Sequence, residues 1–362
     1  MFLRLGSWRL PALVTLAAVL LAACATGTTP PPAVGGDDKA IKDPDDLGKD
    51  PTGQKKGPTF YTADAPPPGA GLTVDPAGAP VPGGPVRLAT ASPGKRSVRL
   101  LSPGDAPLEI RVYSPKVGSK ETLTIATKTA TTASAGGQPL PGGDAGLPPT
   151  TFEIALVVKE VSDGQIKSEF VVRKAAAKAK SAESPTAKYA AGVVALKGAK
   201  GTVSTTRGGD AIAVQVDEAA DDANKDLLRD HLLTPAVPFP EAPIGNGAKW
   251  EIRTPVTSDG MRTEHTVVYE LTALTKGKGR VTITTTITAP EQDIEVPGAP
   301  VSPHLTRFEG TGKGAASVEL SKVTARSWTL SSATKATISV SLMGTDLSGE
   351  MTAKSDSKRV GK

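Results

Sequence analysis

The chain has 362 residues, of which 38 are glycine and 32 are proline, so these two types make up about a fifth of the sequence. Average usage is roughly 7% glycine and 5% proline, and the excess argues against a compact helical enzyme over the whole length. The single cysteine excludes an internal disulfide, a cysteine-rich zinc site and an iron–sulfur cluster within one chain. The formal net charge of +5 includes Arg4 and Arg9 of the N-terminal segment, and it is too small to predict a nucleic-acid partner.

Residues 1–23 have the features of a secretory signal peptide. Arg4 and Arg9 provide a charged start, and an apolar run follows from Leu10 to Leu21. This run is shorter than the about 20 apolar residues that a membrane-spanning helix needs. We therefore expect the chain to be exported.

The apolar run ends in Leu21-Ala22-Ala23-Cys24, which resembles the lipobox of bacterial lipoproteins. The resemblance implies cleavage between Ala23 and Cys24 and a lipid, palmitate among its acyl groups, on the Cys24 thiol. Two or more acyl chains, at about 0.8 kcal/mol per buried CH₂, make a stable anchor. Ala25 implies sorting to the outer membrane by the same resemblance, with the periplasmic and surface faces both open. The alternative is an ordinary A-x-A site of a soluble secreted protein.

Residues 24–104 are rich in proline, glycine and charged residues and have few side chains worth burying. Such a composition predicts a disordered, lipid-anchored tether between the membrane and a folded domain. The acidic run Asp43–Asp46 lacks the spacing of a calcium-binding loop, so we interpret it as solvated charge.

From residue 105 to residue 355 the sequence alternates between polar and apolar residues. Period-two alternation rich in Thr and Val predicts antiparallel strands with one solvent-exposed face. The predicted strands are residues 121–129, 152–161, 166–172, 266–274, 281–287 and 327–342, with a hairpin of 201–206 and 211–216 around Arg207–Asp210. Lys276–Gly279 predicts another tight turn. Residues 356–362 are expected to form a basic tail.

Two segments have helical spacing instead. Residues 184–198 combine Ser-Pro at the start with a glycine stop at Gly198. Residues 218–233 place Ala220, Ala223, Leu227, Leu228 and Leu232 on one stripe and end before Pro235, so this helix should lie across a sheet. The fold class is therefore α+β: a large curved antiparallel sheet, like a half-open β-barrel, with one or two helices packed on one face.

Pro238–Trp250 is a proline-rich segment that we expect to lie extended over the sheet before a strand begins at Trp250. Its G-x-G-x-x-W ending, together with Leu100–Gly104, resembles an uncharacterised family of exported bacterial lipoproteins over roughly residues 98–355. The layout also resembles outer-membrane lipoprotein carriers, which hold acyl chains between a curved sheet and covering helices. That second likeness concerns the fold alone.

The sequence contains no G-x-S-x-G, H-E-x-x-H or Walker pattern. His231 falls near the C-terminal end of a predicted helix, where the helix dipole stabilises a positively charged side chain. His265 follows Glu264 in a strand, so the two side chains should point to opposite faces. His304 falls in a predicted loop. Three histidines so far apart in the sequence predict neither a metal site nor a catalytic pair, and no cofactor is expected.

Two further runs have both a functional and a structural interpretation. Arg173–Lys180 is the densest basic run of the folded part, and it predicts either contact with lipid phosphates or, as we favour, a solvated hairpin end. Gly310–Gly314 lacks the spacing of a dinucleotide site and predicts a hairpin or a bulge.

The first functional hypothesis is a non-catalytic, lipid-anchored lipoprotein of the cell envelope whose sheet domain is a binding or structural module. The alternative is a carrier or sensor of an apolar ligand, such as a lipid or an acyl chain, for which we expect an apolar cavity under the helix of residues 218–233. A hydrolase is a third hypothesis and requires histidine, acidic and serine side chains to converge. The expected partners are the membrane, through Cys24, and an apolar ligand or an envelope protein.

Overall fold

The computed structural model of the chain describes residues 92–93, 96–139, 146–179, 186–217, 222–233, 236–258, 261–294, 302–342 and 345–362. The predicted signal peptide, the predicted lipobox and the predicted tether as far as residue 91 lie outside these residues. The described residues all belong to one unit of the chain.

Fifteen strands of the described residues form one antiparallel sheet. Its path runs β1-β11-β12-β13-β15-β16-β17-β4-β6-β7-β8-β9, with β2 beside β11, β5 beside β4 and β14 beside β15. The strands of the N-terminal half are β1 Ser92–Pro93, β2 Ser97–Ser102, β4 Lys120–Ala135, β5 Gln138–Pro139, β6 Thr150–Val161, β7 Gln165–Ala177, β8 Lys200–Thr206 and β9 Ala211–Val216. The others are β11 Lys249–Ser258, β12 Met261–Thr275, β13 Lys278–Ala289, β14 Gln292–Asp293, β15 His304–Glu319, β16 Ser327–Leu342 and β17 Thr345–Gly361. A separate two-stranded sheet pairs β3 Asp105–Glu109 with β10 Ile244–Asn246.

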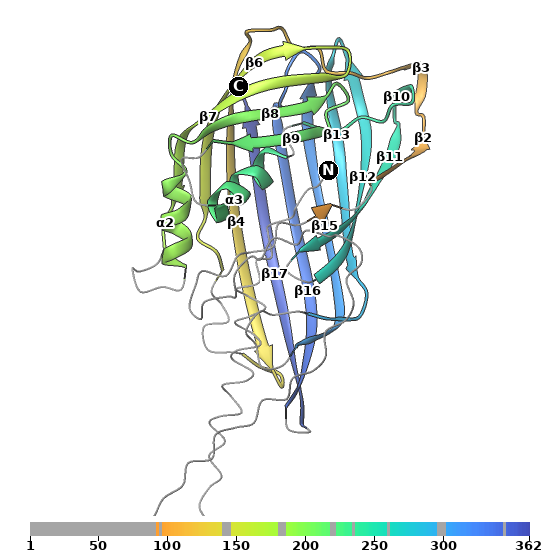
Figure 1. Cartoon of the computed structure of the whole chain (residues 1–362). Helices are drawn as coiled ribbons and strands as arrows, with labels where there is room; N and C mark the ends of the chain where they lie inside the picture. The colour runs from red at the N-terminus through yellow and green to blue at the C-terminus, as the bar shows by residue number, and fades with distance from the viewer. Residues whose placement is uncertain are drawn as a thin grey trace, which may run out of the picture. The chain divides into compact units, whose positions relative to one another are not determined.

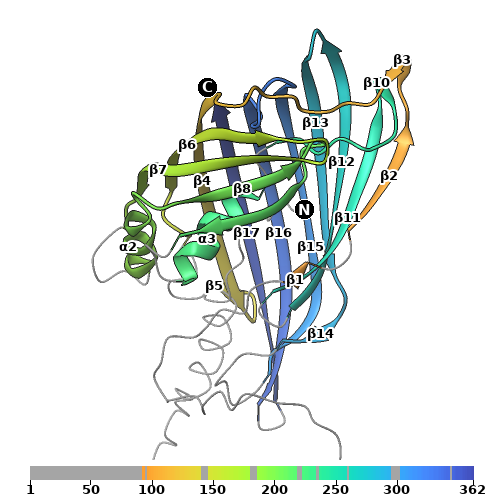
Figure 2. The same ribbon diagram turned by 45° about the horizontal axis from the view of Figure 1, so that its top comes forward.

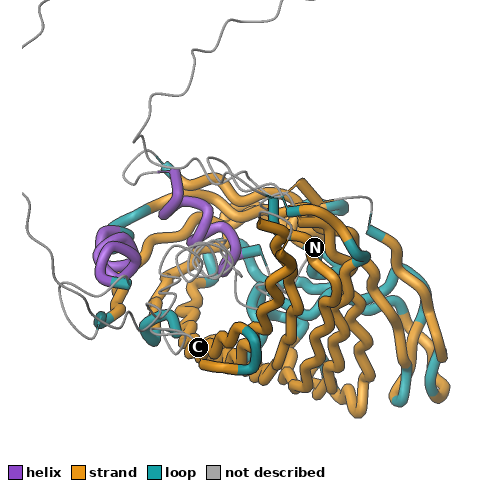
Figure 3. Tube along the Cα trace, turned by 90° about the horizontal axis from the view of Figure 1, so that it is seen from below, coloured by secondary structure: helices purple, strands orange, loops and turns teal. Residues whose placement is uncertain are grey.

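The sheet is strongly curved and does not close into a barrel, as predicted. In Figures 1 and 2 the long strands β4, β17, β16 and β15 stand side by side, while β6 to β9 turn across one side of them. The view from below in Figure 3 shows the sheet bending around an interior that also contains the helices. We call the face of the sheet that looks into this bend the inner face and the opposite one the outer face.

The alternation of polar and apolar residues predicted most strands correctly. β16 spans the predicted residues, and β6, β7, β12 and β13 contain the predicted cores with one to five more residues at their ends. The turn between β12 and β13 has two successive positive φ angles, 50° at Lys276 and 73° at Gly277. This geometry belongs to the turns that match the twist of a two-residue hairpin, so the predicted turn is confirmed.

Both predicted helices are present, in shorter form. α2 covers Ala187–Ala195 and is followed by Gly198 at a φ of +90°, a conformation that glycine adopts without strain. α3 covers Asp222–Leu232, and residues 218–221 of the prediction lie outside the described residues. Neither helix is long and apolar enough to cross a membrane.

Two predicted boundaries are wrong. The tether does not extend to residue 104, because residues 97–102 form β2, which pairs with β11 and packs Leu100 against the core. Residues 356–362 are not a tail either, because β17 continues to Gly361 between β16 and β4. The tail was predicted because its residues are charged or carry hydroxyl groups, as in a solvent-exposed segment. In the structure, however, Ser357 and Arg359 point inward and Asp356 and Lys358 point outward, which is the alternation of a strand.

The prediction of a hairpin or bulge at Gly310–Gly314 is also wrong. These residues lie inside β15, in unbroken register with both neighbours. The glycines are needed because adjacent side chains occupy the space above them. A Cβ on Gly310 would lie 2.5 Å from Thr334 Cγ2, and one on Gly312 would lie 2.5 Å from Thr285 Oγ1.

The interior contains two apolar clusters of buried residues. The larger one joins β11 to β17 with residues 236–248, and the smaller one joins β4, β6, β7 and β8 to the helices. Leu227, Leu228 and Leu232 of α3 pack into the smaller cluster, so the predicted stripe does face the sheet. Because side chains occupy the space between α3 and the sheet, a ligand of the sheet would have to lie elsewhere on the inner face.

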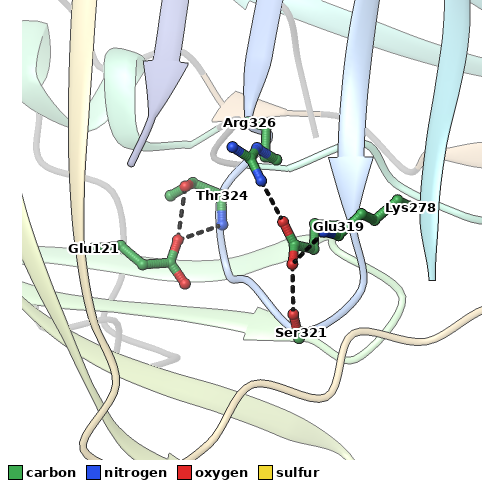
Figure 4. A network of polar contacts seen from close by, with 6 residues as sticks. All are labelled: Glu121, Lys278, Glu319, Ser321, Thr324 and Arg326. Carbon is green, nitrogen blue, oxygen red and sulfur yellow. Dashed lines mark hydrogen bonds and ion pairs between the residues drawn. The ribbon is translucent and has the colours of Figure 1, made fainter. Parts of the chain in front are cut away.

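A buried carboxylate connects the loop between β15 and β16 to β4 (Figure 4). Glu121 accepts hydrogen bonds from the backbone nitrogens of Val323 and Thr324, at 2.9 and 3.2 Å, and from Thr324 Oγ1 at 2.8 Å. Beside it, Glu319 accepts hydrogen bonds from Arg326 and Ser321 at the rim of the sheet. Three donors to one carboxylate satisfy the charge that burial would otherwise disfavour, so Glu121 has a structural role.

Candidate functional site

The site predicted with most support from the sequence lies outside the described residues. Cys24 and Ala23, the predicted lipidation and cleavage positions, are not among the described residues. The acidic run Asp43–Asp46 also lies outside the described residues. The candidate site that the structure describes is therefore the inner face of the sheet and its surroundings.

The three histidines lie on three different elements. His231 is in the last turn of α3, the helix end at which it was predicted, and its ring centroid is 5.1 Å from that of Phe152. His265 of β12 points inward, and its Nε2 is 3.1 Å from Thr263 Oγ1. His304 begins β15 instead of lying in a loop, and its Nδ1 is 2.8 Å from Asp293 Oδ1 at the surface.

These positions do not bring a histidine, an acid and a serine together in the part of the chain that the structure describes. The same part contains no group of three or more His, Cys, Asp or Glu side chains that could hold a metal ion. Arg173 and Lys174 of the basic run are exposed on β7, as solvated charges are. The convergence that a hydrolase requires is thus not found among the described residues.

The register of the strands arranges the inner face in rows that cross the sheet. One row joins Thr285, Gly312, Ser332, Ser355 and Thr129, and the next joins Gly310, Thr334, Ala353 and Thr131, with the larger Ile287 beside Gly310 at its end. We call these nine residues, without Ile287, the small-residue belt. They are small or carry hydroxyl groups, unlike an ordinary sheet core built of Val, Leu and Ile.

Larger apolar side chains flank the belt on both sides. Toward one end of the strands the adjoining row contains Ile283, Gly314, Leu330, Ser357 and Thr127, and the row beyond it contains Val281, Ala316, Trp328, Arg359 and Ile125. Toward the other end the adjoining row contains Ala289, Phe308, Ala336, Met351 and Ala133. The inner face therefore changes from apolar to hydroxyl-rich and back to apolar along the strands. The outer face is polar throughout β13, where Thr282, Thr284, Thr286 and Thr288 are exposed.

Several polar groups of the inner face have no hydrogen-bond partner among the described residues. They are the Oγ1 atoms of Thr127, Thr285 and Thr334 and the Nε1 atom of Trp328. Thr285 and Trp328 are each only 1% exposed. A buried polar group without a partner is costly, so such groups in native proteins mark places where water or a ligand completes the hydrogen bonds.

Two guanidinium groups reach the same interior. Arg359 of β17 lies over the Trp328 ring, 5.9 Å from its centroid, and burial lowers the pKa of its guanidinium. Burial raises the pKa of Tyr269, and the charges of Arg96 and Arg359 act in the opposite direction. Tyr269 and Arg359 belong to β12 and β17, which are separated by three strands in the sheet.

A ladder of four aromatic rings closes one end of the interior. Tyr113, Phe239, Trp250 and Tyr269 follow one another with centroids 5.6, 5.8 and 5.5 Å apart. Trp250 Nε1 donates to the Pro238 carbonyl at 2.9 Å, and Tyr113 Oη donates to the Val237 carbonyl at 3.0 Å. The segment Pro238–Trp250 is not extended throughout, because the chain bends at residues 241–242 and residues 244–246 form β10 of the two-stranded sheet, after which β11 begins at Lys249. We call this segment the strap, and the aromatic ladder holds it.

The turn between β8 and β9 docks on this ladder. Arg207 and Gly208 accept hydrogen bonds from the backbone nitrogens of Tyr113 and Phe239, at 2.7 and 2.8 Å. The sequence predicted the turn but not its contacts, because its partners lie about a hundred residues before it and thirty after it in the chain. The arrangement of the site suits binding, since its groups are rings, hydroxyls and hydrogen-bond donors.

Comparison with known proteins adds little. No protein-family model matches the chain, and no curated protein is significantly similar to it. Among solved structures, the chain is similar to an outer membrane channel from Pseudomonas putida, with 8% identity over 68% of this chain and 97% of that one and a TM-score of 0.20. A TM-score this low bears on neither fold nor function.

Proposed function

We propose that the protein is a lipoprotein of the cell envelope, attached to the outer membrane through a lipid on Cys24, whose curved sheet is a non-catalytic binding module. The binding face is the inner face, around the small-residue belt. The lipobox resemblance supports the anchor, and the geometry of the sheet supports the binding role. The outer face, with its exposed threonines, is in contact with water.

The observation that carries the binding role is the set of unpartnered polar groups on the inner face. Thr285 and Thr334 of the belt, and Trp328 two rows away from it, bury hydrogen-bonding atoms without partners. The belt itself leaves out the large side chains of a filled core. A stable domain seldom leaves such groups unsatisfied. A bound molecule that offers hydrogen-bond acceptors to the belt and apolar surface to its flanks satisfies them.

The anchor is tested by labelling cells with a fatty-acid analogue. We expect Cys24→Ala to abolish the label and to move the protein from the membrane to the soluble fraction. The matched control is Ala25→Asp, which should keep the label and shift the protein from the outer to the inner membrane, as the lipoprotein resemblance implies. Unchanged labelling of the Cys24→Ala protein would rule out the anchor.

The second candidate function, a carrier or sensor of an apolar ligand, specifies what the belt binds. The apolar rows on both sides of the belt favour it. Mass spectrometry of molecules that copurify with the unlipidated Cys24→Ala protein tests it directly, because that chain carries no covalent lipid. Recovery of a stoichiometric lipid supports a carrier, and recovery of a peptide or protein supports a scaffold.

A pair of neighbouring serines provides the control for the binding face. Ser332 lies in the belt, whereas Ser331 is exposed on the outer face, where its Oγ donates to Asp356. Ser332→Glu places a carboxylate among apolar rows, so it should remove the copurifying molecule, while Ser331→Glu should retain it. Equal retention by both variants would refute binding at the belt.

A further inference from the structure

We propose that the turn Arg207–Asp210 is a latch that holds the two edges of the open sheet together, and that its release opens the inner face. The inference rests on the proposed function in one respect: the molecule that enters when the latch opens is the proposed ligand of the belt. The latch itself rests on contacts of the described residues alone.

The two edges of the sheet are not joined by strand pairing. At one edge are β1 and β2, both paired with β11, and at the other is β9, paired with β8. Within the described residues no backbone ladder connects them. Figures 1 and 2 show the β8–β9 hairpin reaching back across the interior toward β12 and β13. Contacts of its turn therefore provide the closure that a barrel obtains from hydrogen-bonded strands.

The turn is held by specific polar contacts. Besides the two backbone hydrogen bonds to Tyr113 and Phe239, the Arg207 guanidinium donates to Ser114 Oγ at 2.8 Å and to the Tyr113 carbonyl at 3.4 Å. Asp210 forms an ion pair with Arg96, the residue that precedes β2. The ion pair thus joins the turn of one sheet edge to the start of the other.

The turn also fits closely against the aromatic ladder. Gly209 has a φ of +98°, and a Cβ at this position would lie 2.7 Å from both Tyr113 Cε2 and the Val237 carbonyl oxygen. Only glycine permits this approach, because another residue would be strained and would clash with the ring. Asp210 and Arg96 are partly buried, with side chains 25% and 17% exposed, so water screens their attraction less than it would at the surface.

Release of the turn leaves the rest of the fold intact. The hairpin keeps its own pairing between β8 and β9 and its pairing with β7, and the ladder keeps the strap in place. Opening breaks the contacts at the turn and the packing of Val158 and Ile166 on the larger cluster, whereas unfolding breaks whole strand ladders. Segments held by few contacts open with lower free energy than the global transition, so the latch can move while the sheet stays folded.

The test uses the unlipidated full chain and hydrogen exchange. Asp210→Asn removes the ion pair with little change of shape. We expect the amide protons of Tyr113 and Phe239 to exchange about tenfold faster, which is the effect of losing one partly buried ion pair, while β16 and β17 amides keep their rates. The double variant Arg96→Asp/Asp210→Arg should restore slow exchange.

A second ion pair provides the control. Lys159 and Glu169 lie 2.8 Å apart on β6 and β7, at exposed positions away from the turn, so Glu169→Gln should leave the Tyr113 and Phe239 amides unchanged. If Asp210→Asn leaves them unchanged too, or accelerates every strand equally, the latch is refuted. If these amides open in Asp210→Asn but Ser332→Glu retains the copurifying molecule as Ser331→Glu does, the latch stands and the binding role of the inner face fails.

Discussion

Removal of the Glu121 carboxylate should destabilise the sheet more than any other single loss of charge described above. Glu121 is 3% exposed, and it accepts hydrogen bonds from Val323 N, Thr324 N and Thr324 Oγ1. The hydroxyl can turn to another acceptor, but the two backbone N–H groups cannot. In Glu121→Ala each of them remains buried without a partner, at about 1–3 kcal/mol apiece, so we expect a total loss of about 3–4 kcal/mol in the free energy of unfolding.

The loss is large enough to measure by thermal unfolding. For a domain of this size, about 1 kcal/mol shifts the midpoint by about 2–4 °C, so Glu121→Ala should lower Tm by about 10 °C. Glu121→Gln keeps one acceptor oxygen but turns an NH₂ group toward a donor, so its loss should be about half as large. Circular dichroism follows the strands, and Trp328 fluorescence follows the adjoining end of β16.

An exposed glutamate separates this effect from a general effect of charge. Glu309 is paired with Arg307 at 2.9 Å, but its side chain is 51% exposed. Surface pairs contribute about 0–1 kcal/mol, so Glu309→Gln should unfold within about 2 °C of the wild type. If Glu121→Ala behaves like Glu309→Gln, the loop between β15 and β16 does not depend on the carboxylate, and the reasoning from buried donors is refuted.

Three further variants test other parts of the interior. Gly312→Ala should lower the free energy of unfolding by about 1–3 kcal/mol in urea titrations, because its Cβ would lie 2.5 Å from Thr285 Oγ1; a neutral effect would mean that the belt is not tightly packed. Trp250→Phe removes the hydrogen bond to Pro238 and part of the stack on Tyr269, so we expect the free energy of unfolding to fall by about 1–3 kcal/mol and Tm to fall with it. An unchanged Tm would contradict the role of the ladder. The hydrogen bond from Arg253 holds the pKa of Glu251 below its ordinary value, and a carboxyl with a lowered pKa stabilises the fold only while it is ionised. The stability difference between wild type and Glu251→Gln should therefore be full near neutral pH and disappear as pH falls below about 4, whereas a constant difference would contradict the assignment.

Much of the fold follows from local pattern, because a strand with one wet face must alternate. The bounds of β16 and the positive-φ turn at Lys276 and Gly277 were predictable for this reason. The predicted domain boundaries were wrong where the residues of a strand that point inward are themselves polar. In β17, Ser357 and Arg359 are the inward residues, and nothing in their chemistry marks them as part of a core.

The candidate site was less predictable than the fold. Glu121 appeared only as one charged residue in a threonine-rich strand, and its partners are about two hundred residues away in the sequence. The belt depends on the alignment of four or five strands, which no single segment reveals. The contacts of the 207–210 turn likewise depend on curvature that brings distant segments together. What was local in the sequence was predictable, and what depends on register and curvature was not.

The order of the strands has a consequence for how the protein reaches this structure. β4, near the start of the folded part, pairs with β17, which follows it by about two hundred residues in the sequence, and this pairing is the junction between the strands β4 to β9 and the strands β11 to β17. The central seam of the sheet therefore cannot form until β17 has been delivered. Contacts of such high sequence separation slow folding and leave two unfinished sheet edges exposed meanwhile. The strands β4 to β9 must wait, unpaired at β4, for β17, so shortening of β17 should impair assembly of the whole sheet.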